Sequence, residues 1–251
     1  MLIKVTNFCS MGCSHCMEDS TVRGAHMPLD LFERALDCTA RIEGLAWRRG
    51  IPPLVLLSGG ECTEHPSIAQ LVARVLARGW IPLLITNGAW LADPTLRASL
   101  LRPEWARLFV QVTHDPRFYP SAPPPRVDDR RVTYIDALTA LIPLGRLARK
   151  KGPHPLPTKA APSSFNFRLF VRGHGSIERA VYELRKRVIH CSPSISDDGT
   201  VVAGETRQCF AIGTVDSPTA ALSKAAIEMR CNACGLVDNL SPAHRAAIGE
   251  P

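Results

Sequence analysis

The sequence predicts an α/β fold built on a parallel sheet, and two observations lead to this expectation. Short apolar and β-branched runs, of the kind that form buried strands, alternate with longer amphipathic segments along three quarters of the chain. Parallel strands need crossover connections that are usually helical, so this alternation indicates repeated βαβ units. The chain has 251 residues, 45% of them hydrophobic, which is enough to bury a sizeable core.

About six strand–helix units precede Ile189. In the first helix Leu29, Phe32 and Leu36 are interspersed with charged residues, and Pro28 stands near its start. The expected strands are LIKVT at 2–6, LVLLS at 54–58, IPLLIT at 81–86, RLFVQVT at 107–113, RVTYI at 131–135 and FNFRLFV at 165–171. The expected helices span about 28–42, 66–78, 94–101, 136–150 and 176–188.

The segment HDPRFYPSAPPPRVDD contains five prolines between Pro116 and Pro125 and predicts an extended surface loop. The polar motifs follow directly after expected strands. Because parallel strands present their functional loops at their C-terminal ends, we expect these motifs to converge on one face.

Composition narrows the class of protein. The formal charge is +7, yet the basic residues are scattered without interleaved aromatics, which favours a solvated basic surface over a nucleic-acid site. No run of about 18 apolar residues and no signal peptide is present, so we expect a cytoplasmic protein without a membrane partner. Nine cysteines in that compartment indicate metal binding more than disulfides.

Cys9, Cys13 and Cys16 form a C-x3-C-x2-C triplet directly after the first expected strand. Three thiolates can hold three irons of a 4Fe–4S cluster and leave the fourth iron open for a small molecule with an amine and a carboxylate. Zinc, with His15 as a fourth ligand, is the alternative. Structural zinc sites usually use paired C-x2-C or Cys/His knuckles, which the triplet lacks.

The second expected strand runs into Gly59, Gly60 and Glu61. Paired glycines let the backbone approach a ligand closely, and an acidic side chain can pair with an ammonium group. The alternative is an ordinary tight turn. Cys62, which follows, is expected as a small turn residue, and a thiol reaching the pocket is the other interpretation.

In this order, the triplet and the GGE motif, followed by TNG at 86–88, resemble the radical S-adenosylmethionine (SAM) superfamily. The resemblance implies a partial (β/α)6 TIM-like barrel over residues 1–188. It implies an enzyme that reductively cleaves SAM to a 5'-deoxyadenosyl radical, with an external electron donor such as flavodoxin or ferredoxin. The implied SAM-site residues are Gly59, Gly60, Glu61, Thr86, Asn87, Thr113 and His15.

Two departures from the family pattern stand out. The family usually has proline where this chain has Cys62, and no counterpart of its fifth-strand adenine motif is evident. The TNG segment is also compatible with a plain turn. Cys38, in the first expected helix, is interpreted as a buried thiol.

The C-terminal quarter carries a second set of cysteines, Cys191, Cys209, Cys231 and Cys234. With DDG at 197–199 and the segment GETRQCFAIGTV, residues 189–251 resemble the twitch domain, a shortened SPASM domain that holds an auxiliary cluster. The resemblance implies a second, fully ligated 4Fe–4S cluster for electron transfer or site architecture. A structural zinc site with four thiolates is the competing interpretation.

The segments YID at 134–136 and VRGHG at 171–175 are similar to the radical SAM dehydrogenase of aminocyclitol biosynthesis, which makes Arg172 a candidate substrate contact. An exposed arginine after a strand is the alternative. The resemblance implies oxidation or crosslinking of a small polyol, an amino sugar or a ribosomally made peptide. Against the peptide, the chain begins directly with the first expected strand, which leaves no room for a leader-binding domain. Activation of a partner enzyme and a non-catalytic iron–sulfur or zinc module are the rival hypotheses.

Overall fold

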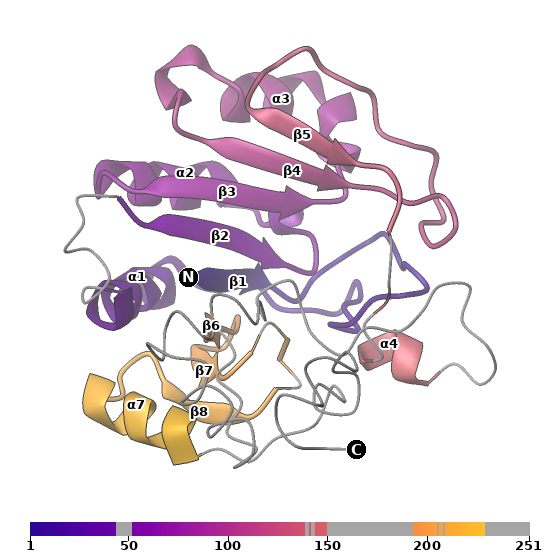
Figure 1. Ribbon diagram of the computed structural model, residues 1–251. Helices are drawn as coiled ribbons and strands as arrows, with labels where there is room; N and C mark the ends of the chain where they lie inside the picture. Colours follow the sequence, from indigo (N-terminus) through magenta and orange to yellow (C-terminus); the bar gives the residue numbers. More distant parts are fainter. Residues whose placement is uncertain are drawn as a thin grey trace, which may run out of the picture.

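The structure, a computed structural model, describes residues 1–43, 52–138, 141, 144–149, 193–204, 206–207 and 209–228. In that part of the chain, eight strands form one sheet in the order β5-β4-β3-β2-β1-β6-β7-β8 (Figure 1). They are β1 (Leu2–Thr6), β2 (Leu54–Gly59), β3 (Ile81–Thr86), β4 (Phe109–Thr113), β5 (Val132–Ile135), β6 (Ser194–Ile195), β7 (Thr200–Val202) and β8 (Ala211–Thr214).

The first five strands pair in parallel, each with its neighbour in the chain. Their arrows point the same way in Figure 1, so their C-terminal ends share one edge of the sheet. The expected parallel α/β architecture is therefore confirmed, with strand bounds within two residues of those expected. The expected strand at 165–171 and the helix at 176–188 lie outside the described residues.

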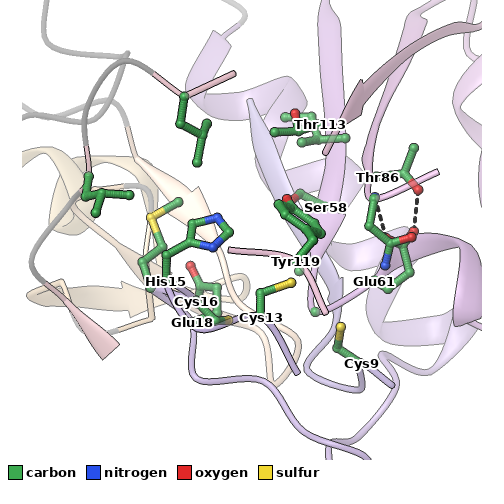
Figure 2. A pocket seen from close by; sticks show the side chains of 17 residues that line it. Cys9, Cys13, His15, Cys16, Glu18, Ser58, Glu61, Thr86, Thr113 and Tyr119 are labelled. Carbon is green, nitrogen blue, oxygen red and sulfur yellow. Dashed lines mark hydrogen bonds between the residues drawn. The ribbon is translucent and has the colours of Figure 1, made fainter. Parts of the chain in front are cut away.

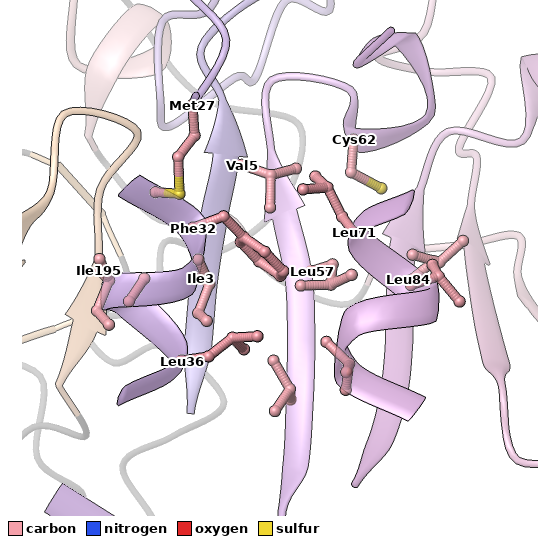
Figure 3. Packing of buried hydrophobic residues seen from close by; sticks show 14 of the residues in the cluster. Ile3, Val5, Met27, Phe32, Leu36, Leu57, Cys62, Leu71, Leu84 and Ile195 are labelled. Atoms are coloured by element: carbon pink, nitrogen blue, oxygen red, sulfur yellow. The ribbon is translucent and has the colours of Figure 1, made fainter. Parts of the chain in front are cut away.

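Three helices connect these strands: α1 (Leu29–Glu43), α2 (Ile68–Ala77) and α3 (Pro94–Leu100). Ile3 and Val5 of β1 form one buried cluster with Phe32 and Leu36 of α1 (Figure 3). Each such side chain stabilises the fold by about 1.5–3 kcal/mol through burial. Because successive residues of a strand face opposite sides, Lys4 lies on the other face of β1.

Two cysteines belong to this core. Cys38 of α1 is fully buried, as expected, and burial raises the pKa of its thiol. Cys62 is also fully buried in this cluster (Figure 3), and its thiol donates to the Ile85 carbonyl at 3.3 Å. It belongs to the apolar cluster, which agrees with its interpretation as a turn residue.

The helix expected over 136–150 is wrong in its extent. Residues 136–138 are not helical, and within the described part of this stretch the helix is α4 (Gly145–Ala148). Pro143 has no N–H for a helical hydrogen bond and restricts the residue before it. Gly145 has a positive φ of 58°, which also interrupts a continuous helix.

The C-terminal strands extend the same sheet. β6 pairs in parallel with β1, and β7 and β8 form an antiparallel hairpin followed by α7 (Thr219–Glu228). The sheet thus continues from residues expected in the barrel into residues expected in the C-terminal extension. Among the helices of the described residues, none is long and apolar enough to cross a membrane.

Candidate active site at the strand ends

A cavity of about 290 Å³ lies where the loops after β1, β2, β3 and β4 meet (Figure 2). It has the size of a small-molecule site. It brings together all the residues expected at the first cluster and around SAM: Cys9, Cys13, His15, Cys16, Gly59, Gly60, Glu61, Thr86, Asn87 and Thr113. The convergence expected from the strand-end rule is therefore observed.

The three cysteines lie on the cysteine loop, which we define as residues 7–25 between β1 and the approach to α1. The loop folds back on itself, since Asn7 N donates to Ala25 O at 2.8 Å and Cys9 N donates to Thr21 O at 3.1 Å. Gly12 allows the turn between the first two cysteines, with a φ of 68°.

Burial raises the pKa of the Cys9 thiol to about 11 and that of Cys13 to about 12. These thiols are protonated at neutral pH, and a bound metal must displace their protons. Within the described residues, no three His, Cys, Asp or Glu side chains converge on the position of a single metal ion. The three thiols do line the same cavity, and a 4Fe–4S cluster would take each thiolate on a different iron.

The two glycines after β2 are needed because the backbone around Thr6 and Phe8 approaches them too closely for a side chain. A Cβ on Gly59 would lie 2.0 Å from the Thr6 carbonyl oxygen, and one on Gly60 would lie 2.0 Å from that of Phe8. Gly60 N and Glu61 N donate to these same two carbonyls, both at 2.8 Å. The glycines thus let β2 approach the backbone that leads into the cysteine loop.

The Glu61 carboxylate is buried and accepts hydrogen bonds from two loops. Its Oε1 accepts from Thr63 N at 3.0 Å and from the Thr63 hydroxyl at 2.6 Å. It also accepts from the Thr86 hydroxyl at 2.6 Å (Figure 2). Its Oε2 accepts from Asn87 N at 2.7 Å. Burial raises the Glu61 pKa, and these bonds oppose the shift. The carboxylate therefore orders the ends of β2 and β3.

The TNG segment is both a turn and a cavity wall. Gly88 N donates to the Thr86 hydroxyl at 3.0 Å, and Ala89 N donates to Asn87 Oδ1 at 2.8 Å. Gly88 has a φ of 81°. Thr113, at the end of β4, faces the same cavity (Figure 2). The turn geometry and the cavity contact are therefore compatible.

Two aromatic residues of the site were missed because the proline-rich segment predicted a surface loop. Phe118 is buried, its carbonyl accepts from Ser14 N at 3.0 Å, and Tyr119 lines the cavity. The His15 ring lies 5.0 Å from the Phe118 ring and 5.2 Å from the Tyr119 ring, centroid to centroid. An aromatic pair directly after the strand that ends in Thr113 was the available signal.

One carboxylate fixes this aromatic segment. Asp115 accepts from Arg117 Nε at 2.9 Å and from Leu138 N at 2.8 Å. The Arg117 guanidinium holds the pKa of the Asp115 carboxyl well below its usual range. The segment that carries Tyr119 is therefore pinned to the stretch after β5, where Leu138 lines the cavity.

A buried ion pair, which the sequence pattern did not predict, borders the cavity. Lys4 Nζ lies 2.9 Å from Glu18 Oε1, and the two side chains are 4% and 9% exposed. Burial lowers the Lys4 pKa, and Glu18 opposes that shift. Glu18 Oε2 also accepts from Arg207 N at 3.2 Å. A single carboxylate therefore links the cysteine loop to the connection between β7 and β8.

That connection contains Cys209, which is half-buried, with its N–H bonded to Thr206 O at 2.9 Å. It lies between the antiparallel strands β7 and β8, as expected for a cysteine-bearing hairpin. The other expected ligands of a second cluster, Cys191, Cys231 and Cys234, and the candidate substrate contact Arg172 lie outside the described residues.

No protein-family model and no curated protein matches the chain. Among solved structures, it is similar to Streptococcus suis SuiB bound to S-adenosylmethionine, with 20% identity and a TM-score of 0.35. The match covers 45% of this chain and 24% of that one. SuiB bound to the precursor peptide SuiA matches with 18% identity, the same TM-score and the same coverage. The chain thus spans about a quarter of the length of these proteins.

Proposed function

We propose that this protein is a radical SAM enzyme, which binds a 4Fe–4S cluster through Cys9, Cys13 and Cys16 and binds SAM beside it. The observation that carries this proposal is one cavity whose wall combines three thiols with the C-terminal ends of the neighbouring strands. When bound, such a cluster would supply the electron for reductive cleavage of SAM, which is the radical chemistry needed to abstract hydrogen from a substrate.

The residues of the cavity fit the chemical groups of SAM. Glu61 Oε2 accepts one hydrogen bond, from Asn87, and a carboxylate oxygen has capacity for a second, which suits the ammonium of the methionine part. The rings of His15 and Tyr119, which both line the cavity, offer aromatic surface against which adenine can pack. Leu138 and the neighbouring apolar side chains help to exclude water.

The test uses anaerobically reconstituted protein. Reduction in the presence of SAM should yield 5'-deoxyadenosine, and Cys13→Ala should abolish the product together with the SAM-dependent change in the cluster's spectrum. Cys38→Ala is the matched control, because this thiol lies in the core and not among the residues of the cavity. An intact cluster that neither responds to SAM nor forms 5'-deoxyadenosine would remove the proposal.

We also propose a second 4Fe–4S cluster, held by Cys191, Cys209, Cys231 and Cys234. The hairpin that carries Cys209 and its link to Glu18 support an auxiliary site close to the first. Iron and sulfide should approach two clusters per chain. An iron content that Cys209→Ala and Cys234→Ala leave unchanged would count against this second cluster, while leaving the first one unaffected.

For the reaction after hydrogen abstraction, we propose oxidation of the substrate. An auxiliary cluster held by the four C-terminal cysteines would supply an acceptor for the electron. A small polyol or amino sugar and a ribosomally made peptide are the two substrate classes. Once a substrate that the enzyme converts has been identified, Arg172→Ala should retain SAM cleavage but form no product, since we propose that Arg172 contacts the substrate. Equal product yield would refute that role.

A further inference from the structure

Arg146, on α4, makes several contacts to the cysteine loop, although it lies 133 residues after Cys13 in the chain. Its backbone N–H donates to Cys16 O at 2.8 Å. Its guanidinium donates to Cys13 O through Nη1 and to Ser20 O at 2.7 Å through Nη2. These three carbonyls bracket the second and third cysteines of the triplet. One residue thus fixes the course of the loop on both sides of Cys16.

The approach of α4 to the loop depends on the residue before Arg146. A Cβ on Gly145 would lie 2.4 Å from Met17 O and 2.6 Å from Cys16 O. Gly145 also has a positive φ of 58°, which other residues rarely adopt. The glycine therefore lets the Arg146 backbone come within hydrogen-bonding distance of the loop.

The guanidinium also brings charge to this position. Its donation to Cys13 O keeps a permanent cation next to a residue of the triplet, and the arginine side chain is only 24% exposed. Asp19 is shared between Arg146 and Arg149, so one carboxylate faces two cations. Arg146, Arg149 and Asp19 together therefore carry a net positive charge.

From these contacts we propose that Arg146 is a positioning residue for the cysteine loop, which holds the loop in its cluster-binding shape and raises the reduction potential of the cluster. The second part rests on the proposed function. A nearby positive charge favours the reduced, more negative state of a cluster, so its loss lowers the potential.

The first experiment measures hydrogen–deuterium exchange in the full chain without iron. Arg146→Gln loses the two guanidinium bonds to loop carbonyls, and amides of residues 9–20 should exchange roughly tenfold faster. Arg149→Gln is the matched control, since Arg149 contacts the loop through the exposed Asp19 pair and should leave exchange unchanged. Equal exchange in wild type and Arg146→Gln would overturn the positioning role, whether or not the protein binds a cluster.

The second experiment measures the midpoint potential of the reconstituted cluster, which a merely structural role would not move. Arg146→Gln should lower the midpoint potential by about 59 mV, which corresponds to a tenfold change in the equilibrium constant of a one-electron reduction. Arg146→Lys keeps the charge without the planar fork, so it should restore the potential but not the slow exchange. An unchanged potential in Arg146→Gln would overturn the electrostatic part. A wild type that binds no cluster would instead refute the proposed function.

Discussion

Removal of the Lys4 ammonium tests whether the stability of the fold depends on one buried ion pair. Lys4→Met keeps most of the length of the unbranched side chain and deletes its charge. The Glu18 carboxylate then stays buried, with the Arg207 N–H as its remaining described donor. A buried carboxylate without its cation is the unfavourable state that the pair prevents.

The size of the effect follows from burial. Since the side chains are 4% and 9% exposed, solvent screens the pair weakly, and breaking it from one side costs about 3–5 kcal/mol. Glu18→Leu should cost a similar amount, because it strands the ammonium. The double variant removes both charges, so its main penalty is the unpaired Arg207 N–H, about 1–3 kcal/mol.

Urea unfolding followed by circular dichroism measures these free energies. The two single variants would add to about 6–10 kcal/mol if the residues acted independently, whereas the double variant should lose only about 1–3 kcal/mol. Additive losses in the double variant would show that Lys4 and Glu18 stabilise the fold separately, and the argument from the pair would be wrong.

Three further outcomes are expected. Gly60→Ala should lower the melting temperature far more than Gly79→Ala, because its Cβ meets the Phe8 carbonyl at 2.0 Å whereas Gly79 has open space; similar losses would contradict the backbone-contact argument. Because the folded state lowers the pKa of Asp115, this carboxylate contributes stability above about pH 4 that is lost as the pH falls. Asp115→Asn should therefore make the free energy of unfolding depend less on pH in the acid range. Parallel curves of stability against pH for the two proteins would refute this. Because two loop thiols have raised pKa values, of about 11 and about 12, ferrous iron binding by the iron-free chain should strengthen from about pH 6 to about pH 8; a constant affinity would contradict this.

Much of the first half of the fold was predictable from local patterns. LIKVT and IPLLIT form strands with the expected bounds, since apolar and β-branched runs suit a buried parallel strand. The cavity residues from Cys9 to Thr113 were also predictable, because each motif follows a strand and parallel strands end along one edge.

The errors fall where local composition and tertiary contact disagree. The proline count correctly predicted a loop whose residues are mostly exposed, yet within this loop Phe118 is buried and Tyr119 lines the cavity. A helix was expected near 136–150, whereas residues 136–138 are not helical and the described helix begins only at Gly145, which has a positive φ. In both segments a backbone restriction or a distant partner outweighs propensity.

The amino-acid sequence by itself determined the first five strands, their parallel direction and the thiols of the triplet, because hydrophobic period and residue chemistry are properties of short segments. Tertiary structure alone decided which distant groups meet: Arg146 at the carbonyl of Cys13, and Arg207 at the carboxylate of Glu18, 189 residues away. Such contacts depend on how several loops close together over the strand ends, and no local pattern encodes that closure.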